Sequence, residues 1–164
     1  MAIKGARADL GSVTPHLMVR GGDAAIDFYR RAFGALLLYR VEITHPSCIQ
    51  AHLRVGHSMI MVADEATDEP ADGLGSPRSP EALGATTVTL GQYVEGVDAS
   101  YARAIEAGAT SVMEPSDAPN GDRCAAIQDP FGHRWTIMTM IEELTGEQVA
   151  GRMRDIAAHG NRAG

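Results

Sequence analysis

The sequence predicts an α+β fold, in which two βαβββ units form a curled eight-stranded mixed sheet with a concave cleft. Strand and helix patterns occur in the same order, strand–helix–strand–strand–strand, in both halves of the chain. Gly56-His57 matches Gly132-His133, and the segment 32–35 (AFGA) matches 106–109 (EAGA) at nearly the same offset. Because one helix covers only one face of four strands, the other face must be covered by a second unit or line a ligand cleft.

The first unit begins with a strand over 13–19, in which Pro15 indicates an edge position or a bulge. Asp23 stands where a helix N-cap belongs, Gly34 is a typical C-cap, and the apolar residues between them recur at helical spacing. Three further strands are expected over 36–43, 48–55 and 58–62, separated by a turn at 45–47 (His-Pro-Ser) and a tight turn at 56–57.

The segment 63–84 is rich in Pro, Gly, Ser and acidic residues without periodicity, which predicts a linker or a flexible lid. Beyond it, a helix from Val97 to Gly108 and strands over 85–90, 109–113, 123–128 and 134–140 repeat the order of the first unit. Thr145 and Gln148 form a capping box that predicts a last, separate helix. One domain is therefore expected over 1–164, with unit one at 12–63, a loop at 64–84, unit two at 85–140 and the C-terminal helix at 145–158.

Composition excludes several classes of protein. The formal net charge of −7 argues against binding to nucleic acid or to anionic membranes, which favours a basic face. No apolar run approaches the ~18 residues of a membrane span, and the N-terminus lacks the apolar segment of a secretory signal. Because two cysteines cannot form a disulfide scaffold, a reducing, cytoplasmic location is expected.

Several sequence blocks carry a family resemblance: TPHLMV (14–19), AIDFYRRAFGA (25–35), SPEALG (79–84), VEGVDASYARAIEAGAT (94–110), GDR (121–123), DPFGHRW (129–135) and IEELTGEQVAGRM (141–153). In these blocks the chain resembles the vicinal oxygen chelate superfamily of glyoxalase I, bleomycin-resistance proteins, fosfomycin-resistance enzymes and extradiol dioxygenases, and most of all its PhnB-like subgroup. The resemblance spans about 13–153 and implies the glyoxalase-like fold. It does not by itself imply one activity, because this scaffold carries many chemistries.

The resemblance also implies where a divalent metal would bind in metal-using members, at symmetric places on the first and last strand of each unit. Carried over one at a time, these positions are Thr14 and Ile60 in the first unit and Thr87 and Thr136 in the second. Neutral hydroxyls and an aliphatic side chain are poor ligands for such an ion. No metal and no other cofactor is therefore expected.

Further candidates share the strand faces that the resemblance turns inward. They are His16 and Met18 on the first strand, Cys48, Gln50 and His52 on the third, and Cys124, Gln128 and Met138 in the second unit. His16 and His52 are candidates for acid–base catalysis, or with a cysteine for a zinc site; alternatively these side chains are polar walls of a pocket. His57 and His133 are expected to serve their turns, and Trp135 to pack in the core.

The function expected from these features is binding of a small apolar or aromatic metabolite or antibiotic, without the usual metal, as in bleomycin-resistance proteins. The alternative is a lyase, isomerase or related enzyme that uses His16 and His52 as acid–base groups or as non-standard metal ligands. A third hypothesis is a dimeric partner protein without a small-molecule ligand. A homodimer is expected, because an open sheet leaves edges and apolar surface that need cover.

Overall fold

The structure is a computed structural model that describes residues 10–43, 48–65 and 77–160. The first unit contains β1 (His16–Val19), α1 (Gly22–Phe33), β2 (Leu36–Glu42), β3 (Ile49–Val55) and β4 (Ser58–Asp64). A short helix, α2 (Pro80–Leu83), leads to the second unit. That unit contains β5 (Thr89–Tyr93), α3 (Val97–Ala107), β6 (Thr110–Asp117), β7 (Asp122–Gln128) and β8 (Arg134–Met140), and α4 (Gly146–Gly160) follows it.

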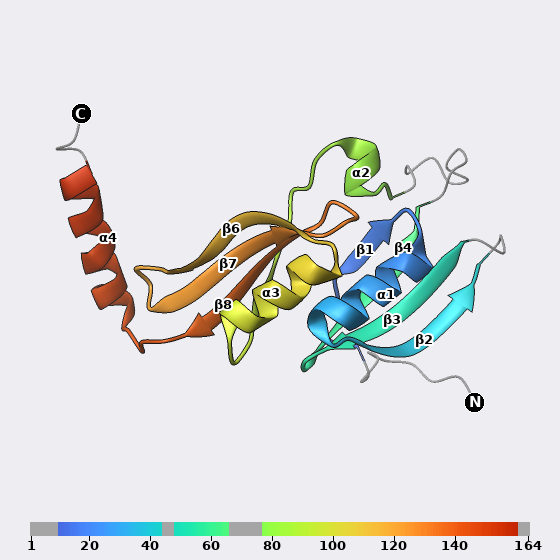
Figure 1. Ribbon diagram of the computed structural model, residues 1–164, viewed down its shortest axis with the longest axis horizontal. Coiled ribbons are helices and arrows are strands. Elements are labelled where there is room, and N and C mark those ends of the chain that lie inside the picture. Colours follow the sequence, from blue (N-terminus) through green and yellow to red (C-terminus); the bar gives the residue numbers. More distant parts are fainter. Residues whose placement is uncertain (1–9, 44–47, 66–76, 161–164) are drawn as a thin grey trace.

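The strands form two four-stranded mixed sheets, sheet 1 in the order β1-β4-β3-β2 and sheet 2 in the order β5-β8-β7-β6. In each sheet the first strand pairs in parallel with the last, and the other pairs are antiparallel. The α+β class and the repeated βαβββ unit are thus confirmed. Figure 1 shows the two sheets side by side along the long axis, with α1 and α3 lying together between them.

Some boundaries differ from those that the sequence predicts. The strand expected over 85–90 is β5 (Thr89–Tyr93), because parallel pairing with β8 begins only where Thr89 meets Arg134. The segment expected to have no regular structure contains α2, whose N-cap Ser79 accepts a hydrogen bond from the Ala82 amide. The turn predicted at 45–47 lies outside the described residues.

The N-terminus of α1 is capped from another element rather than by Asp23. Its N-cap is Gly21, in the left-handed region with φ 90° and without a side chain to cap the helix. One carboxylate oxygen of Asp64, at the end of β4, accepts hydrogen bonds from the amides of Gly21 and Gly22 at 2.9 and 2.7 Å. Asp23 instead pairs with Arg40 of β2, so the sequence pattern identified the helix start but assigned the cap to the wrong carboxylate.

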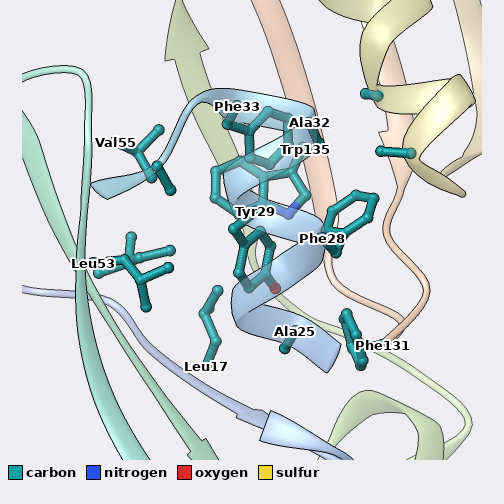
Figure 2. Packing of buried hydrophobic residues seen from close by; sticks show 14 of the residues in the cluster. Leu17, Ala25, Phe28, Tyr29, Ala32, Phe33, Leu53, Val55, Phe131 and Trp135 are labelled. Carbon is teal, nitrogen blue, oxygen red and sulfur yellow. The ribbon is translucent and has the colours of Figure 1, made fainter. Parts of the chain in front are cut away.

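An aromatic cluster joins the two units (Figure 2). Phe28, Tyr29 and Phe33 of α1 contact Phe131 and Trp135 of the second unit, with ring centroids 4.6 to 6.3 Å apart. Trp135 is buried, as expected. Figure 2 shows these rings between α1 and the second unit, so the hydrophobic core is continuous across the junction.

The buried Asp129 carboxylate is the polar centre of this junction. It accepts hydrogen bonds from the Tyr29 hydroxyl at 2.7 Å and from the Trp135 indole nitrogen at 3.0 Å. Its other oxygen accepts from the backbone amides of Phe131 and His133. Burial, and secondarily the Asp129 carboxylate, raises the pKa of Tyr29 well above its usual value, which keeps the hydroxyl protonated as a donor.

The C-terminal helix α4 extends from the far end of sheet 2 (Figure 1). The predicted capping box is confirmed: the Gln148 side-chain oxygen accepts from the Thr145 amide at 2.8 Å, and the Thr145 hydroxyl oxygen accepts from the Gln148 amide at 3.3 Å. Met153 and Ile156 on this helix are 49% and 53% exposed. Among the residues that the structure describes, no helix has the length and hydropathy needed to cross a membrane.

Candidate functional site

The candidate site is the face of sheet 1 that points away from α1, here called the concave face. Four side chains lie in register across its four strands, because His16 pairs with Met61, Met61 with His52 and His52 with Tyr39. The rings of Tyr39 and His52 lie 5.0 Å apart and are tilted by 45°. His52 is 7% exposed, whereas Tyr39 on the edge strand is 49% exposed. The row therefore alternates imidazole, thioether, imidazole and phenol.

The surroundings of His16 change its protonation equilibrium. Partial burial, and secondarily the proximity of His52, lowers the pKa of His16 below its ordinary value. The neutral imidazole is therefore favoured at neutral pH, and it offers one donor and one acceptor nitrogen. In the next row, Met18, Ala63, Gln50 and Val41 pair across the same four strands and add one amide to an otherwise apolar surface.

The corresponding face of sheet 2 is also lined by small, apolar and weakly polar groups. One row pairs Gly91, Thr136, Ala126 and Met113, and the next pairs Tyr93, Met138, Cys124 and Ser116. The Tyr93 hydroxyl donates to the buried Asp122 carboxylate at 2.9 Å. We use the term concave face for this surface too; like that of sheet 1, it carries exposed large apolar side chains, among them Tyr93 and Met113.

The structure places most of the predicted site residues on these two faces. His16, Met18, Gln50 and His52 belong to the sheet 1 rows, and Thr136, Met138, Cys124 and Gln128 to the sheet 2 face. The Gln128 amide donates to the Gly132 carbonyl at 3.3 Å.

Four other predicted residues lie elsewhere. Cys48 immediately precedes β3, Thr14 lies two residues before β1, and Thr87 lies two residues before β5 as an exposed residue. Ile60 lies on the opposite face of β4, buried in the core, because Met61 and not Ile60 shares the face of His16. The symmetric pattern of the two units aligned Ile60 with Thr136, but the pairing register puts these two side chains on different faces.

The positions that the family resemblance assigns to a divalent metal do not fit such an ion. Three of them are threonines, whose neutral hydroxyls bind divalent ions weakly, and Ile60 has no donor atom and is buried in the core. Over 10–43, 48–65 and 77–160, no three His, Cys, Asp or Glu side chains gather closely enough to hold a metal ion. Burial, and secondarily a nearby aspartate, raises the pKa of the Cys48 and Cys124 thiols, which disfavours the thiolate as ligand or nucleophile.

Sequence reasoning missed Tyr39 and Met61, which complete the row of the two histidines. The alternation of β4 placed Met61 and Ile60 on opposite faces but did not say which face was inward. In β2 a register shift between Leu37 and Tyr39 changes the face on which each following residue lies. A bulge of this kind has no reliable sequence signal, so Tyr39 was not identified.

His133 has a structural role that differs from that of its counterpart His57. Its Nε2 lies 3.0 Å from the carbonyl oxygen of Met18, which accepts its hydrogen bond, so the turn of unit two contacts the first strand of unit one. His57 is exposed at the equivalent turn of unit one. The symmetry of the two turns in the sequence is therefore not a symmetry of contacts.

Comparison with known proteins agrees with this architecture. The profile of the Glyoxalase/Bleomycin resistance protein/Dioxygenase superfamily matches residues 10–137. Uncharacterised proteins of Mycobacterium bovis and Mycobacterium tuberculosis are 37% identical over 142 residues, which cover 87% of this chain and 91% and 82% of theirs.

Solved structures show the same fold. TioX from Micromonospora sp. ML1 is 30% identical with a TM-score of 0.60, and the match covers 79% of this chain and 99% of TioX. A glyoxalase/bleomycin resistance protein/dioxygenase family enzyme from Burkholderia phytofirmans PsJN is 20% identical with a TM-score of 0.55, over 76% of this chain and 94% of that protein.

Proposed function

Because the chain belongs to the glyoxalase/bleomycin resistance protein/dioxygenase superfamily, we propose that it binds a small apolar or aromatic molecule on its concave faces, without a divalent metal ion. The blocks DPFGHRW and FYRRAFGA support assignment to the PhnB-like subgroup of that superfamily as part of this proposal. Its acidic net charge and its two unpaired cysteines fit a cytoplasmic location.

The observation that carries this proposal is the row of His16, Met61, His52 and Tyr39 across sheet 1. A phenol ring, two imidazoles and a flexible thioether provide flat and adaptable contacts for an aromatic molecule. The imidazole nitrogens and the Gln50 amide supply a few hydrogen bonds that orient it, as in most small-molecule sites. The surface lacks the cluster of carboxylates and histidines that a metal-dependent reaction would need, within the part of the chain described.

A second copy of the chain completes the site in this proposal. The concave faces are open in the single chain, and they expose large apolar side chains such as Leu36, Tyr39 and Tyr93. Exposed large apolar side chains of this kind are typical of an interface rather than of a face in contact with water. The apolar residues of α4, spaced as Val149, Met153 and Ile156, form a stripe that packs on the second copy.

The test is recovery of the ligand and measurement of its affinity. The purified full chain is examined by native mass spectrometry for a bound small molecule and by elemental analysis for metal. The dye 1-anilinonaphthalene-8-sulfonate then serves as an aromatic probe. His52→Ala weakens its binding by about 1–3 kcal/mol, or about 5- to 150-fold, because a buried polar contact is lost. Arg103→Ala on α3, away from the concave faces, is the control and leaves the affinity unchanged. Equal affinity in His52→Ala and the wild type would contradict the proposed site.

One observation favours a second candidate function, a metal-independent lyase or isomerase reaction. His16 has a lowered pKa and faces His52 across Met61, so a neutral imidazole is available as a general base beside a second imidazole. In this case His16→Ala and His52→Ala abolish turnover of a substrate while its binding largely survives. A stoichiometric zinc, nickel or manganese ion, removable by a chelator with loss of activity, would refute the metal-free proposal and favour an enzyme with His16 and His52 as non-standard ligands.

A further inference from the structure

Asp122, at the start of β7, is a carboxylate on the concave face of sheet 2 that is only 5% exposed. It lies on this face because it alternates with Arg123, whose guanidinium bonds to Asp98 of α3 on the other side of the sheet. Arg134 pairs with Gln128 at the far end of β7, roughly 20 Å away at the rise of a strand. Across the described residues, Asp122 therefore has no ion-pair partner, although buried carboxylates normally have one.

Two neutral side chains hold this carboxylate in place. The Tyr93 hydroxyl donates to Asp122 Oδ2 at 2.9 Å, and the Asn120 amide donates to the same oxygen at 2.8 Å. The other oxygen, Oδ1, accepts no hydrogen bond from the described residues. It also retains contact with solvent, since Gln92 Oε1 alone among their side-chain atoms is both shielded and unbonded. The negative charge of Asp122 is thus oriented by hydrogen bonds but not balanced by a cation.

Tyr93 is the exposed member of this pair. It is 64% exposed and lies on the concave face beside its β8 partner Met138. The hydrogen bond to Asp122, and secondarily partial burial, raises the pKa of Tyr93, so the phenol stays protonated. Because its hydrogen points to Asp122, the lone pairs of Tyr93 Oη remain available to accept. A ligand group that meets this oxygen must therefore be a hydrogen-bond donor.

Apolar side chains adjoin the pair. Tyr93, Met138 and Cys124 form one row across three strands, and Met140, which pairs with Asp122, is 62% exposed. Thioethers adapt to the shape of an apolar or aromatic body, and the face of a phenol ring attracts a cation. This end of sheet 2 thus combines an apolar surface with an acceptor and an unbalanced negative charge.

We propose that Tyr93 and Asp122 form a subsite for a protonated amine carried by an apolar or aromatic ligand. The ammonium group donates to Tyr93 Oη, and the charge of Asp122 directly behind that oxygen attracts it. Tyr93 contacts the ligand, and Asp122 is a positioning residue that also supplies the charge. This inference rests on the proposed function, because it names the chemical class of the molecule that binds the concave faces.

Two probes of similar shape test the subsite. The full chain is titrated by isothermal calorimetry at neutral pH with 1-naphthylmethylamine, which is protonated, and with 1-naphthalenemethanol, which is neutral. The amine is expected to bind about tenfold more tightly, because hydrogen bonds with a charged partner are stronger than neutral ones. The ratio of the two affinities is the readout, since a purely structural defect lowers both affinities together.

Asp122→Asn keeps the size of the side chain and removes its charge, and the preference for the amine falls to about twofold or less while the alcohol binds as before. Tyr93→Phe, at an exposed position that tolerates the change, removes the acceptor and also loses most of the preference. Asp117→Asn is the matched control. It removes the same charge from the neighbouring strand, at an exposed residue bonded to Arg123, and keeps the preference.

The outcomes separate this inference from the proposed function. Equal affinity of the wild type for the two probes, with His52→Ala still weakening both, would overturn the amine subsite and leave the proposed function standing. An equal loss of both affinities in Asp122→Asn, in a variant that circular dichroism shows to be folded, would show that Asp122 only shapes its turn and would also overturn it. Absence of saturable binding of either probe to the wild type would contradict the subsite and the proposed function together.

Discussion

Tyr29→Phe removes the hydrogen bond that joins α1 to the buried Asp129 carboxylate, and it keeps the ring. The hydroxyl donates to Asp129 at 2.7 Å from a side chain that is fully buried. This contact spans the two units, so its loss weakens the junction on which the relative position of the two concave faces depends. The variant is expected to fold, because the phenylalanine ring fills the same space.

The size of the expected loss in the free energy of unfolding depends on the hydrogen bonds that Asp129 retains in the variant. Hydrogen bonds to charged groups contribute about 1.5–3 kcal/mol, and the larger values apply when a buried partner is left without any bond. Asp129 still accepts from the Trp135 indole and from the amides of Phe131 and His133. The expected loss is therefore near the lower limit, about 1.5–2 kcal/mol. Asp129→Ala leaves four donors without their acceptor and is expected to cost about 4 kcal/mol or more.

Urea unfolding followed by circular dichroism measures both variants. For a chain of this size, the loss in Tyr29→Phe corresponds to a melting temperature lower by about 3–8 °C. Tyr101→Phe on α3 is the matched control, since the Tyr101 side chain is only partly buried, and its free energy of unfolding should change by less than about 0.5 kcal/mol. A loss below about 0.5 kcal/mol in Tyr29→Phe would show that the junction does not depend on this hydrogen bond.

Three further outcomes are expected. Burial raises the pKa of Glu65, but the Ser79 amide and the Arg20 guanidinium outweigh it and lower the pKa to about 2. The ionised Glu65 carboxylate therefore stabilises the fold fully above its ordinary pKa, and this stabilisation is lost as the pH falls towards 2. Glu65→Gln flattens this part of a plot of melting temperature against pH. Gly22→Ala destabilises the chain by about 1–3 kcal/mol in urea unfolding, because the added Cβ overlaps the Ile49 side chain, whereas Gly96→Ala, with open space around it, has little effect. Removal of α4 by ending the chain at residue 145 is expected to weaken the proposed dimer at least about tenfold in light scattering, and an unchanged dimer would show that the helix does not pack on the second copy.

The amino-acid sequence by itself determined the elements and their repetition. Alternation of apolar residues indicated most strands, helical spacing with Gly34 and Gly108 indicated α1 and α3, and Thr145 with Gln148 indicated the start of α4. These features arise from interactions within a few residues of the chain, so a local pattern is enough to predict them. Burial of Trp135 was predicted for the same reason, because its neighbours alternate with it in β8.

Only the tertiary structure decided which side chains meet. Asp64 caps α1 from 42 residues away, Asp129 connects two units, and the bulge in β2 turns Tyr39 towards His52. The register of β4 put Met61 on the concave face and Ile60 in the core. Each of these contacts joins residues far apart in the chain, and a shift of one residue in a strand reverses every face, so no local pattern could have specified them.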